Sequence, residues 1–379
     1  VVIQLSGGND GLNTVVPFSQ ERYYAARPTL AIPKSQVLKI NDQLGLHPSL
    51  DGFEKLLQAE SLAIIQGVGY PEPNRSHFES MDIWHTCHRK GQPREDGWLG
   101  RYLDMTVGLR DGRGVGDGIS ALHLGEEKQP LALRAQETRV ASVQSLKQFR
   151  LAGGGIRQLQ ELIGSAKRDR DAAANALLDF VQDSTQLALT ATERLESATG
   201  NYKTEVKYPE TPLARKLSVA AQLIHSKLNT RIFYVTLDGF DTHSRQADAH
   251  AALLSQLGDA LQAFMEDLRE HGHAGRVLTV CFSEFGRRVQ ENASQGTDHG
   301  AAGPMFLIGP GVQAGLHGKH PSLEDLVQGD LQHAIDFRQV YATILDRWLA
   351  CPSQQILGGE FAPLPLLRCR RTVVAAARL

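Results

Sequence analysis

The chain carries carboxylates, imidazoles and one serine in short polar segments that could bind a metal ion and attack an ester. The candidate metal ligands are Asp10, Asp241, His243, Glu284, Asp298 and His299. Aspartate, glutamate and histidine together suit zinc, manganese, calcium or magnesium, and this mixture does not choose among these divalent metals. The candidate catalytic residues are Ser76, Arg75 and Arg287, and Asn9 and His77 are further site candidates.

Two of these segments point to a metal site most directly. Asp241 and His243 stand two residues apart in a loop, so that a carboxylate oxygen and an imidazole nitrogen can reach one ion. The pair Asp298-His299 lies between glycines and is poorly explained by core packing, although Asp298 is equally suited to orient His299 from outside the metal. For Asp10, the alternative is a tight turn in which Asn9 and Asp10 cap a helix.

Ser76 is predicted at the start of a helix that runs from about His77 to Trp84. Free N–H groups and the positive end of the helix dipole favour anions there. A hydroxyl at this position could attack a phosphate or sulfate ester, with Arg75 or Arg287 holding the anion. The alternative is that Ser76 only caps the helix.

Six short, nearly continuous apolar runs precede or follow these segments: 1–5, 62–68, 119–124, 232–237, 277–282 and 305–308. Such runs are typical of strands buried on both faces of a parallel sheet. Ligands of open α/β sheets bind at the carboxyl ends of the strands, so the polar segments are expected to meet there.

Helical stretches alternate with these strands, notably 246–271, whose leucines recur at helical spacing, and 336–349. The alternation predicts a three-layer αβα sandwich with a mostly parallel central sheet, as one domain over 1–379. A mainly helical insertion is expected at about 150–228, either as a cover for the sheet edge or as a cap over the site.

Composition excludes several classes of function. The formal net charge is −2, which gives no basic excess for nucleic acid or a membrane surface. No apolar run reaches the roughly 20 residues that span a bilayer. The four cysteines form no CxxC pair, Cys281 is expected to be buried in a strand, and a disulfide between Cys351 and Cys369 stays open. The chain begins with Val1 inside an expected strand, so we expect the native chain to start earlier.

Taken together, the motifs resemble the bacterial family called domain of unknown function 1501, which is grouped with the alkaline phosphatase and sulfatase superfamily. The resemblance is carried by LSGGNDGLN (5–13), NRSHF (74–78), FDTH (240–243), FSEFGR (282–287) and GTDHG (296–300). It implies the superfamily pattern, with Asp10, Asp241, His243, Glu284 and His299 at metal positions and Ser76 at the nucleophile position. Because members often carry twin-arginine export signals, it also implies a periplasmic or secreted protein.

The first hypothesis is therefore a metal-dependent hydrolase of phosphate or sulfate esters, acting on a small molecule or a glycan. Asp241 and His243 are closer together than the superfamily spacing, and no histidine follows Glu284. The alternative is a non-catalytic exported module that binds an anionic glycan or a protein partner through the same pocket. A third interpretation is that the polar loops are structural and bind no ion.

Overall fold

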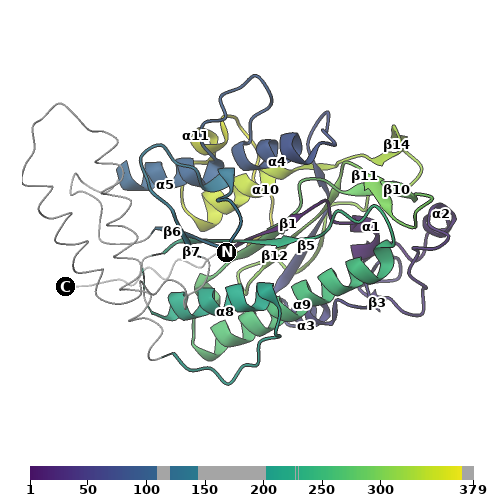
Figure 1. Cartoon of the computed structure of the whole chain (residues 1–379), viewed down its shortest axis with the longest axis horizontal. Helices are drawn as coiled ribbons and strands as arrows, with labels where there is room; N and C mark the ends of the chain where they lie inside the picture. Colours follow the sequence, from purple (N-terminus) through teal and green to yellow (C-terminus); the bar gives the residue numbers. More distant parts are fainter. Residues whose placement is uncertain (109–119, 144–201, 227, 229, 369–379) are drawn as a thin grey trace, which may run out of the picture.

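A nine-stranded sheet runs through the middle of the computed structural model, which describes residues 1–108, 120–143, 202–226, 228 and 230–368 (Figure 1). Its strands, in spatial order, are β13 (Gly315–His317), β5 (Leu62–Gly69), β12 (Gly303–Ile308), β9 (Thr279–Phe282), β1 (Val2–Ser6), β8 (Ile232–Asp238), β6 (Ala121–Leu124) and β7 (Ala141–Val143), with β16 (Ile335–Asp336) also paired to β5. All six predicted strands are present. The three others that the sequence did not predict, β7, β13 and β16, are only two or three residues long.

Within the described part of this sheet, every pairing is parallel except those of β12. β12 runs antiparallel to both β5 and β9, as in the pairs Phe306 with Ile64 and Phe306 with Cys281. The segment before β12 therefore lies at the same edge as the carboxyl ends of β1, β5, β8 and β9. This direction brings the loop that contains Asp298 and His299 to the edge where the other polar segments end.

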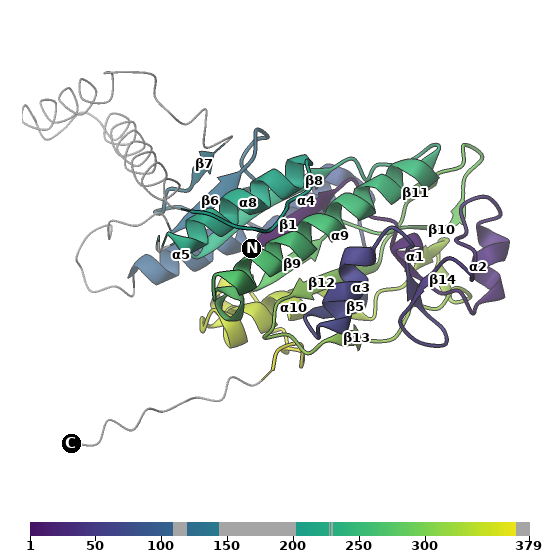
Figure 2. The same cartoon turned by 90° about the horizontal axis from the view of Figure 1, so that it is seen from below.

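Helices cover both faces of the sheet. One face carries α3 (Asp51–Gln58), α8 (Pro212–His225) and α9 (Gln246–Glu270), and the other carries α4 (His77–Thr86), α5 (Trp98–Gly108), α10 (Phe337–Thr343) and α11 (Ser353–Leu357) (Figures 1 and 2). Neighbouring strand residues feed the two separate cores, with Ile3 in one and Val2 in the other. The predicted three-layer α/β sandwich is confirmed.

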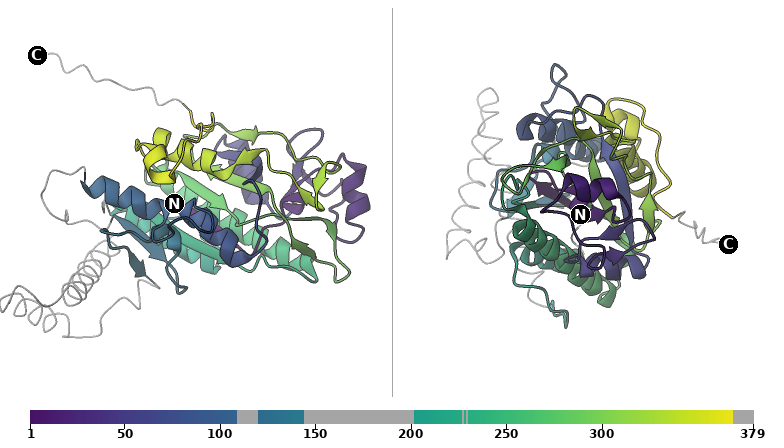
Figure 3. Two further views of the ribbon diagram at one scale, coloured as in Figure 1. Left: turned by 90° about the horizontal axis from the view of Figure 1, so that it is seen from above. Right: turned by 90° about the vertical axis from the view of Figure 1, so that its right-hand side faces the viewer.

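Short elements surround the carboxyl edge of the sheet, at the end that faces the viewer in the right-hand view of Figure 3. They are α1 (Gly11–Thr14), α2 (Glu21–Ala26), β2 (Val15–Val16), β3 (Leu38–Lys39), β4 (Gly45–Leu46), the hairpin of β10 (Arg287–Glu291) with β11 (Thr297–His299), and β14 (Leu326–Val327) with β15 (Asp330–Leu331). A third apolar cluster, which includes Leu12, Tyr23 and Val289, holds this end together. The remaining short helical turns are η1 (Leu131–Leu133), η2 (Ala274–Arg276) and the π-helical η3 (Ile344–Trp348).

The predicted helix at 246–271 is confirmed as α9, and the one at 336–349 is α10 followed by η3. Of the predicted insertion at 150–228, residues 150–201 lie outside the described residues, and α8 packs against α9. Cys281 is buried in β9 as predicted, and Cys351 is also buried, whereas Cys369 lies outside the described residues. No helix among the described residues is long and apolar enough to cross a membrane.

The contact between α3 and α9 gives a test of this packing. A Cβ at Gly52 would lie 2.1 Å from the carbonyl oxygen of Gly258, which belongs to the rigid backbone of α9. We expect Gly52→Ala to push the two helices apart and to lower the free energy of unfolding by about 1–3 kcal/mol. Gly275→Ala is the control, because a Cβ there meets nothing within 4 Å. Equal urea midpoints for the two variants would contradict this packing.

Candidate functional site

Three histidines surround one carboxylate oxygen at the carboxyl edge of the sheet. The distances from the Oδ1 atom of Asp241 to the Nε2 atoms are 3.0 Å for His243, 3.1 Å for His299 and 3.4 Å for His77. These residues come from the loop after β8, the end of β11 and the first position of α4. In a tetrahedral zinc site with bonds of about 2.0–2.2 Å, ligand atoms lie roughly 3.3–3.6 Å apart. The ligand atoms of His77, Asp241 and His299 all lie within 4.8 Å of one another and could hold one ion, and His243 lies beside this group of three.

Each of these imidazoles is fixed through its other nitrogen. The Nδ1 atom of His77 lies 2.9 Å from Glu284 Oε1, and that of His243 lies 3.3 Å from Asp298 Oδ1. The Nδ1 atom of His299 lies 2.7 Å from the backbone carbonyl of Arg75. Carboxylate and carbonyl oxygens accept hydrogen bonds, so each Nδ1 is the donor and each Nε2 of a neutral ring presents a lone pair to Asp241. Metal-binding histidines are oriented in this way.

The contact between His243 and His299 limits which of their Nε2 atoms can carry a proton. The Nε2 atoms of His243 and His299 are 2.8 Å apart and cannot both carry a proton in that contact. At least one lone pair therefore faces another nitrogen and the carboxylate of Asp241. A cation between them would satisfy all of these atoms at once.

The surrounding charges affect the protonation of this group. Partial burial acts to raise the pKa of Asp241, but the hydrogen bond from the Arg287 guanidinium and its charge hold it at about 2. The hydrogen bond to Glu284 raises the pKa of His77, and burial lowers that of His299. Asp241 is therefore ionised and available as an anionic ligand near neutral pH.

Arg287 fixes the loops that carry these ligands. Its side chain is fully buried and donates to the carbonyls of Gly7, Gly8, Phe240 and Thr297 and, at 2.7 Å, to Asp241 Oδ1. Gly7 has a φ of +114°, and a Cβ there would lie 2.3 Å from the Asp241 nitrogen. Because Gly7 has no side chain, the loop after β1 can pack directly against the backbone of the loop that carries Asp241. The expectation that Arg287 clamps a substrate anion is corrected, because its donors serve the protein interior.

The structure does not bring Asp10 and Asn9 into this cluster. Asp10 forms a fully buried ion pair with Arg27 at 2.5 Å, and although burial acts to raise its pKa, Arg27 lowers it below the usual value. Gln246 also donates to Asp10. Asn9 accepts from Thr14 and contacts His250, both at 3.0 Å. Arg27 therefore occupies the position next to the Asp10 carboxylate where the sequence predicted a metal ion.

Glu284 and Asp298 lie beside the cluster, each on the outer side of a histidine. Glu284 is buried, accepts from the Gly7 N–H at 2.8 Å and contacts His77 rather than Asp241. Asp298 contacts His243 and accepts from Asn292 at 3.2 Å. This placement fits a role in orienting the imidazoles, which the sequence left open for Asp298 and did not predict for Glu284.

Ser76 precedes His77, and its side chain is exposed. It is the N-cap residue of α4, but its side chain makes no capping hydrogen bond. It lines a hollow with Glu79 and Arg89 that adjoins the cavity at His77, since Phe78 and Asp82 line both. Arg75 binds Asp330 at 2.6 and 2.8 Å, so its guanidinium is already paired with a carboxylate. Arg75 therefore contributes its carbonyl, which holds His299, and the expectation that it holds a substrate anion is corrected.

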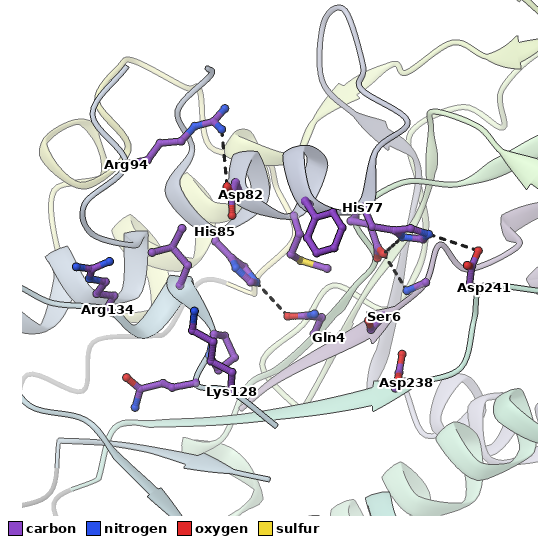
Figure 4. Close-up of a pocket in the computed structure, with 17 residues that line it drawn as sticks. Gln4, Ser6, His77, Asp82, His85, Arg94, Lys128, Arg134, Asp238 and Asp241 are labelled. Carbon is purple, nitrogen blue, oxygen red and sulfur yellow. Dashed lines mark hydrogen bonds and ion pairs between the residues drawn. The ribbon is translucent and has the colours of Figure 1, made fainter. Parts of the chain in front are cut away.

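A cavity of about 850 Å³ opens beside the cluster (Figure 4). Residues of the cluster that line it are His77, Asp241 and Glu284. Its floor includes the buried His85, which lies 3.0 Å from Gln4 Oε1 and whose pKa burial lowers to about 3. Its basic residues are Arg94, Lys128 and Arg134. The sequence predicted none of these three, because they lie in loops outside the recognised motifs, Lys128 in the loop after β6.

Comparison with known proteins identifies a family but no activity. The family model described as "Protein of unknown function (DUF1501)" matches residues 1–358. A search of curated proteins found no match to this chain.

Several solved structures are similar at low sequence identity. The crystal structure of Ps i-CgsB in complex with k-i-k-neocarrahexaose has 11% identity and a TM-score of 0.39, over 95% of this chain and 72% of that chain. A protein in the alkaline phosphatase superfamily from Vibrio parahaemolyticus has 8% identity and a TM-score of 0.39, over 94% and 66%. The alkaline phosphatase from the Antarctic bacterium TAB5 has 11% identity and a TM-score of 0.37, over 82% and 90%. These TM-scores are low, so no activity is carried over.

The role of Arg287 can be tested by removing its charge. We expect Arg287→Met to lower the free energy of unfolding by about 3–5 kcal/mol, because the carbonyls of three loops and Asp241 lose their buried donor. The adjacent Arg288→Met is the matched control, since that side chain is partly exposed and lies 3.7 Å from Asp330. Denaturant unfolding checks this, and an Arg287 variant as stable as the Arg288 variant would contradict it.

Proposed function

We propose that this chain, which belongs to the family described as protein of unknown function (DUF1501), is a metal-dependent hydrolase of phosphate or sulfate esters. The observation that carries the proposal is the convergence of three imidazole Nε2 atoms on Asp241 Oδ1. Each ring is fixed by an acceptor at Nδ1, and a cavity large enough for an organic ester adjoins them.

The proposed metal ligands are His77, Asp241, His243 and His299, with Glu284 and Asp298 orienting two of the rings. Three imidazoles and one carboxylate favour zinc or another transition metal over calcium or magnesium, which prefer oxygen ligands. When bound, such an ion polarises an ester oxygen and lowers the pKa of a nearby hydroxyl or water.

Ser76 is the proposed nucleophile. Its hydroxyl is exposed, is not used to cap α4 and belongs to the residue before the ligand His77. Attack on phosphorus or sulfur would form a serine ester and release the alcohol, which takes up the serine proton. Water would then attack the phosphorus or sulfur, release inorganic phosphate or sulfate and restore the serine hydroxyl. Ser6 at the end of β1 is the other hydroxyl beside the cluster, since it lines the same cavity as His77 and Asp241.

Small molecules or glycans that carry a phosphate or sulfate ester are the proposed substrates. The cavity wall carries the carboxylates of Asp82, Asp238, Asp241 and Glu284 as well as three basic residues, so the support for an anionic substrate comes from the end where Lys128 and Arg134 lie. We also propose that the protein is exported through the twin-arginine pathway and is periplasmic or secreted, as the family resemblance implies.

Metal analysis tests the ligand set. We expect wild-type protein loaded with zinc or manganese to retain about one ion per chain after desalting, and His299→Ala to lose it, because an Nε2 ligand is gone. Glu284→Gln and Asp298→Asn should keep the site but weaken affinity roughly 10- to 100-fold, because only ring orientation is affected.

His317→Ala is the control for histidine loss, because His317 lies on the edge strand β13, away from the cluster, and its side chain contacts the carbonyl of Gln313. The measurements are elemental analysis and competition with a chelator. Wild-type protein that retains no ion after loading would overturn the metal site.

Turnover of 4-nitrophenyl phosphate and 4-nitrophenyl sulfate tests the reaction. We expect the metal-loaded protein to cleave at least one of them and Ser76→Ala to lower kcat roughly a thousandfold or more, because the attacking oxygen is removed. Ser6→Ala is the matched comparison. An active Ser76→Ala with an inactive Ser6→Ala would assign the nucleophile to Ser6. A metal-loaded protein that cleaves neither ester would favour the non-catalytic binding module.

A further inference from the structure

The cavity beside the cluster is longer than the reacting ester group requires. Its volume is about 850 Å³, and an adjoining hollow of about 770 Å³ shares Gln4, Phe78 and Lys128 with it. Cavities of roughly 300–1,000 Å³ hold whole organic ligands. In Figure 4, His77 and Asp241 lie at one end of the cavity and Lys128 and Arg134 lie at the other.

The two cations at the far end form no direct ion pair with any residue that the structure describes, and Lys128 acts on the carboxylate of Asp82 only at longer range. Among the described residues, neither Lys128 nor Arg134 has a carboxylate within ion-pair distance, and both are exposed. Arg94, by contrast, binds Glu79 at 2.7 Å and lies 3.9 Å from Asp82. Lys216 in the adjoining hollow lies 3.3 Å from Glu127. Lys128 and Arg134 are thus the cavity cations whose charge is available to a ligand.

The stretch between the two ends suits a polyhydroxylated ring. Gln4 Oε1 lies 2.6 Å from the hydroxyl of Tyr234 and 3.0 Å from His85, and the Gln4 amide and the hydroxyl of Ser6 belong to the cavity lining. Phe78 is 87% exposed at the rim, which is unusual for a large aromatic side chain. An aromatic face covers the apolar face of a sugar ring, while amide and hydroxyl groups meet its hydroxyls.

We propose that Lys128 and Arg134 bind a second anionic group of the substrate, so that the site prefers sugar esters with two charged substituents to sugars with one. The inference rests on the proposed function for the reacting end, where the metal ligands hold the ester. Phe78 and Gln4 contact the sugar between the two charges. The second anionic group is a phosphate, a sulfate or a carboxylate, since Lys128 and Arg134 can bind each of these.

Calorimetric binding to metal-loaded protein in the Ser76→Ala background tests this. The ligand pairs are glucose 1,6-bisphosphate with glucose 6-phosphate, and the unsaturated chondroitin 6-sulfate disaccharide with N-acetylgalactosamine 6-sulfate. We expect the member with two anionic groups to bind at least tenfold tighter than its partner in at least one pair. Lys128→Gln and Arg134→Gln should each reduce that preference about fivefold, as expected for an exposed ion pair. A preference within the glucose phosphate pair indicates a phosphorylated substrate, and a preference within the chondroitin pair indicates a sulfated one.

Lys55→Gln and Arg22→Gln are the matched controls, because both are exposed side chains on α3 and α2 that do not line the cavity. They should leave the preference unchanged. No preference in either pair, or a preference that survives Lys128→Gln with Arg134→Gln, overturns the inference.

Turnover of the 4-nitrophenyl esters by wild-type protein separates this outcome from failure of the proposed function. Cleavage together with an unaffected preference overturns only the second-anion site. A preference that the two variants abolish in a protein without turnover supports the second-anion site and overturns the hydrolase.

Discussion

The buried guanidinium of Arg287 is the interaction on which the candidate site depends. Burying an arginine costs several kcal/mol unless its donors and its charge are satisfied. Here the donors are taken by carbonyls of the loops after β1 and β8 and of the β10–β11 hairpin, and the charge by Asp241. Because one planar group binds all of these at once, none of the loops can move alone. The position of Asp241 is therefore fixed by the fold.

Strand direction explains why the sequence located most of the cluster. Asp241 and Glu284 follow parallel strands, so their approach to one edge follows from the apolar runs alone. His299 precedes a strand and reaches the same edge because β12 is antiparallel to its neighbours. The sequence indicated the position of His299 before that strand, but no local pattern reveals the direction of β12. Direction depends on which strands become neighbours, and those pairs are distant in the chain.

The failures of sequence reasoning share one physical cause, which is that a charged side chain does not reveal its partner. Asp10 was expected to meet a metal and instead meets Arg27, and either cation neutralises a buried carboxylate. Arg75 was expected to meet a substrate anion and is paired with Asp330, a residue far along the chain. His77 was named only as a further candidate, because its neighbour Ser76 accounted for the motif. Its place beside Asp241 follows from Glu284, which holds its Nδ1 from the opposite side.

Charge balance gives an independent reason for a divalent ion in the cluster. The hydrogen-bonded set contains the carboxylates of Asp241, Glu284 and Asp298 and the guanidinium of Arg287, so three negative charges oppose one positive charge. The three imidazoles add no charge while they are neutral. The 2.8 Å contact between His243 and His299 prevents a proton on both Nε2 atoms, so protonation can supply two positive charges only through His77 and one of these two rings. One divalent cation supplies the same two charges and also uses the lone pairs that the hydrogen bonds at Nδ1 leave directed at Asp241.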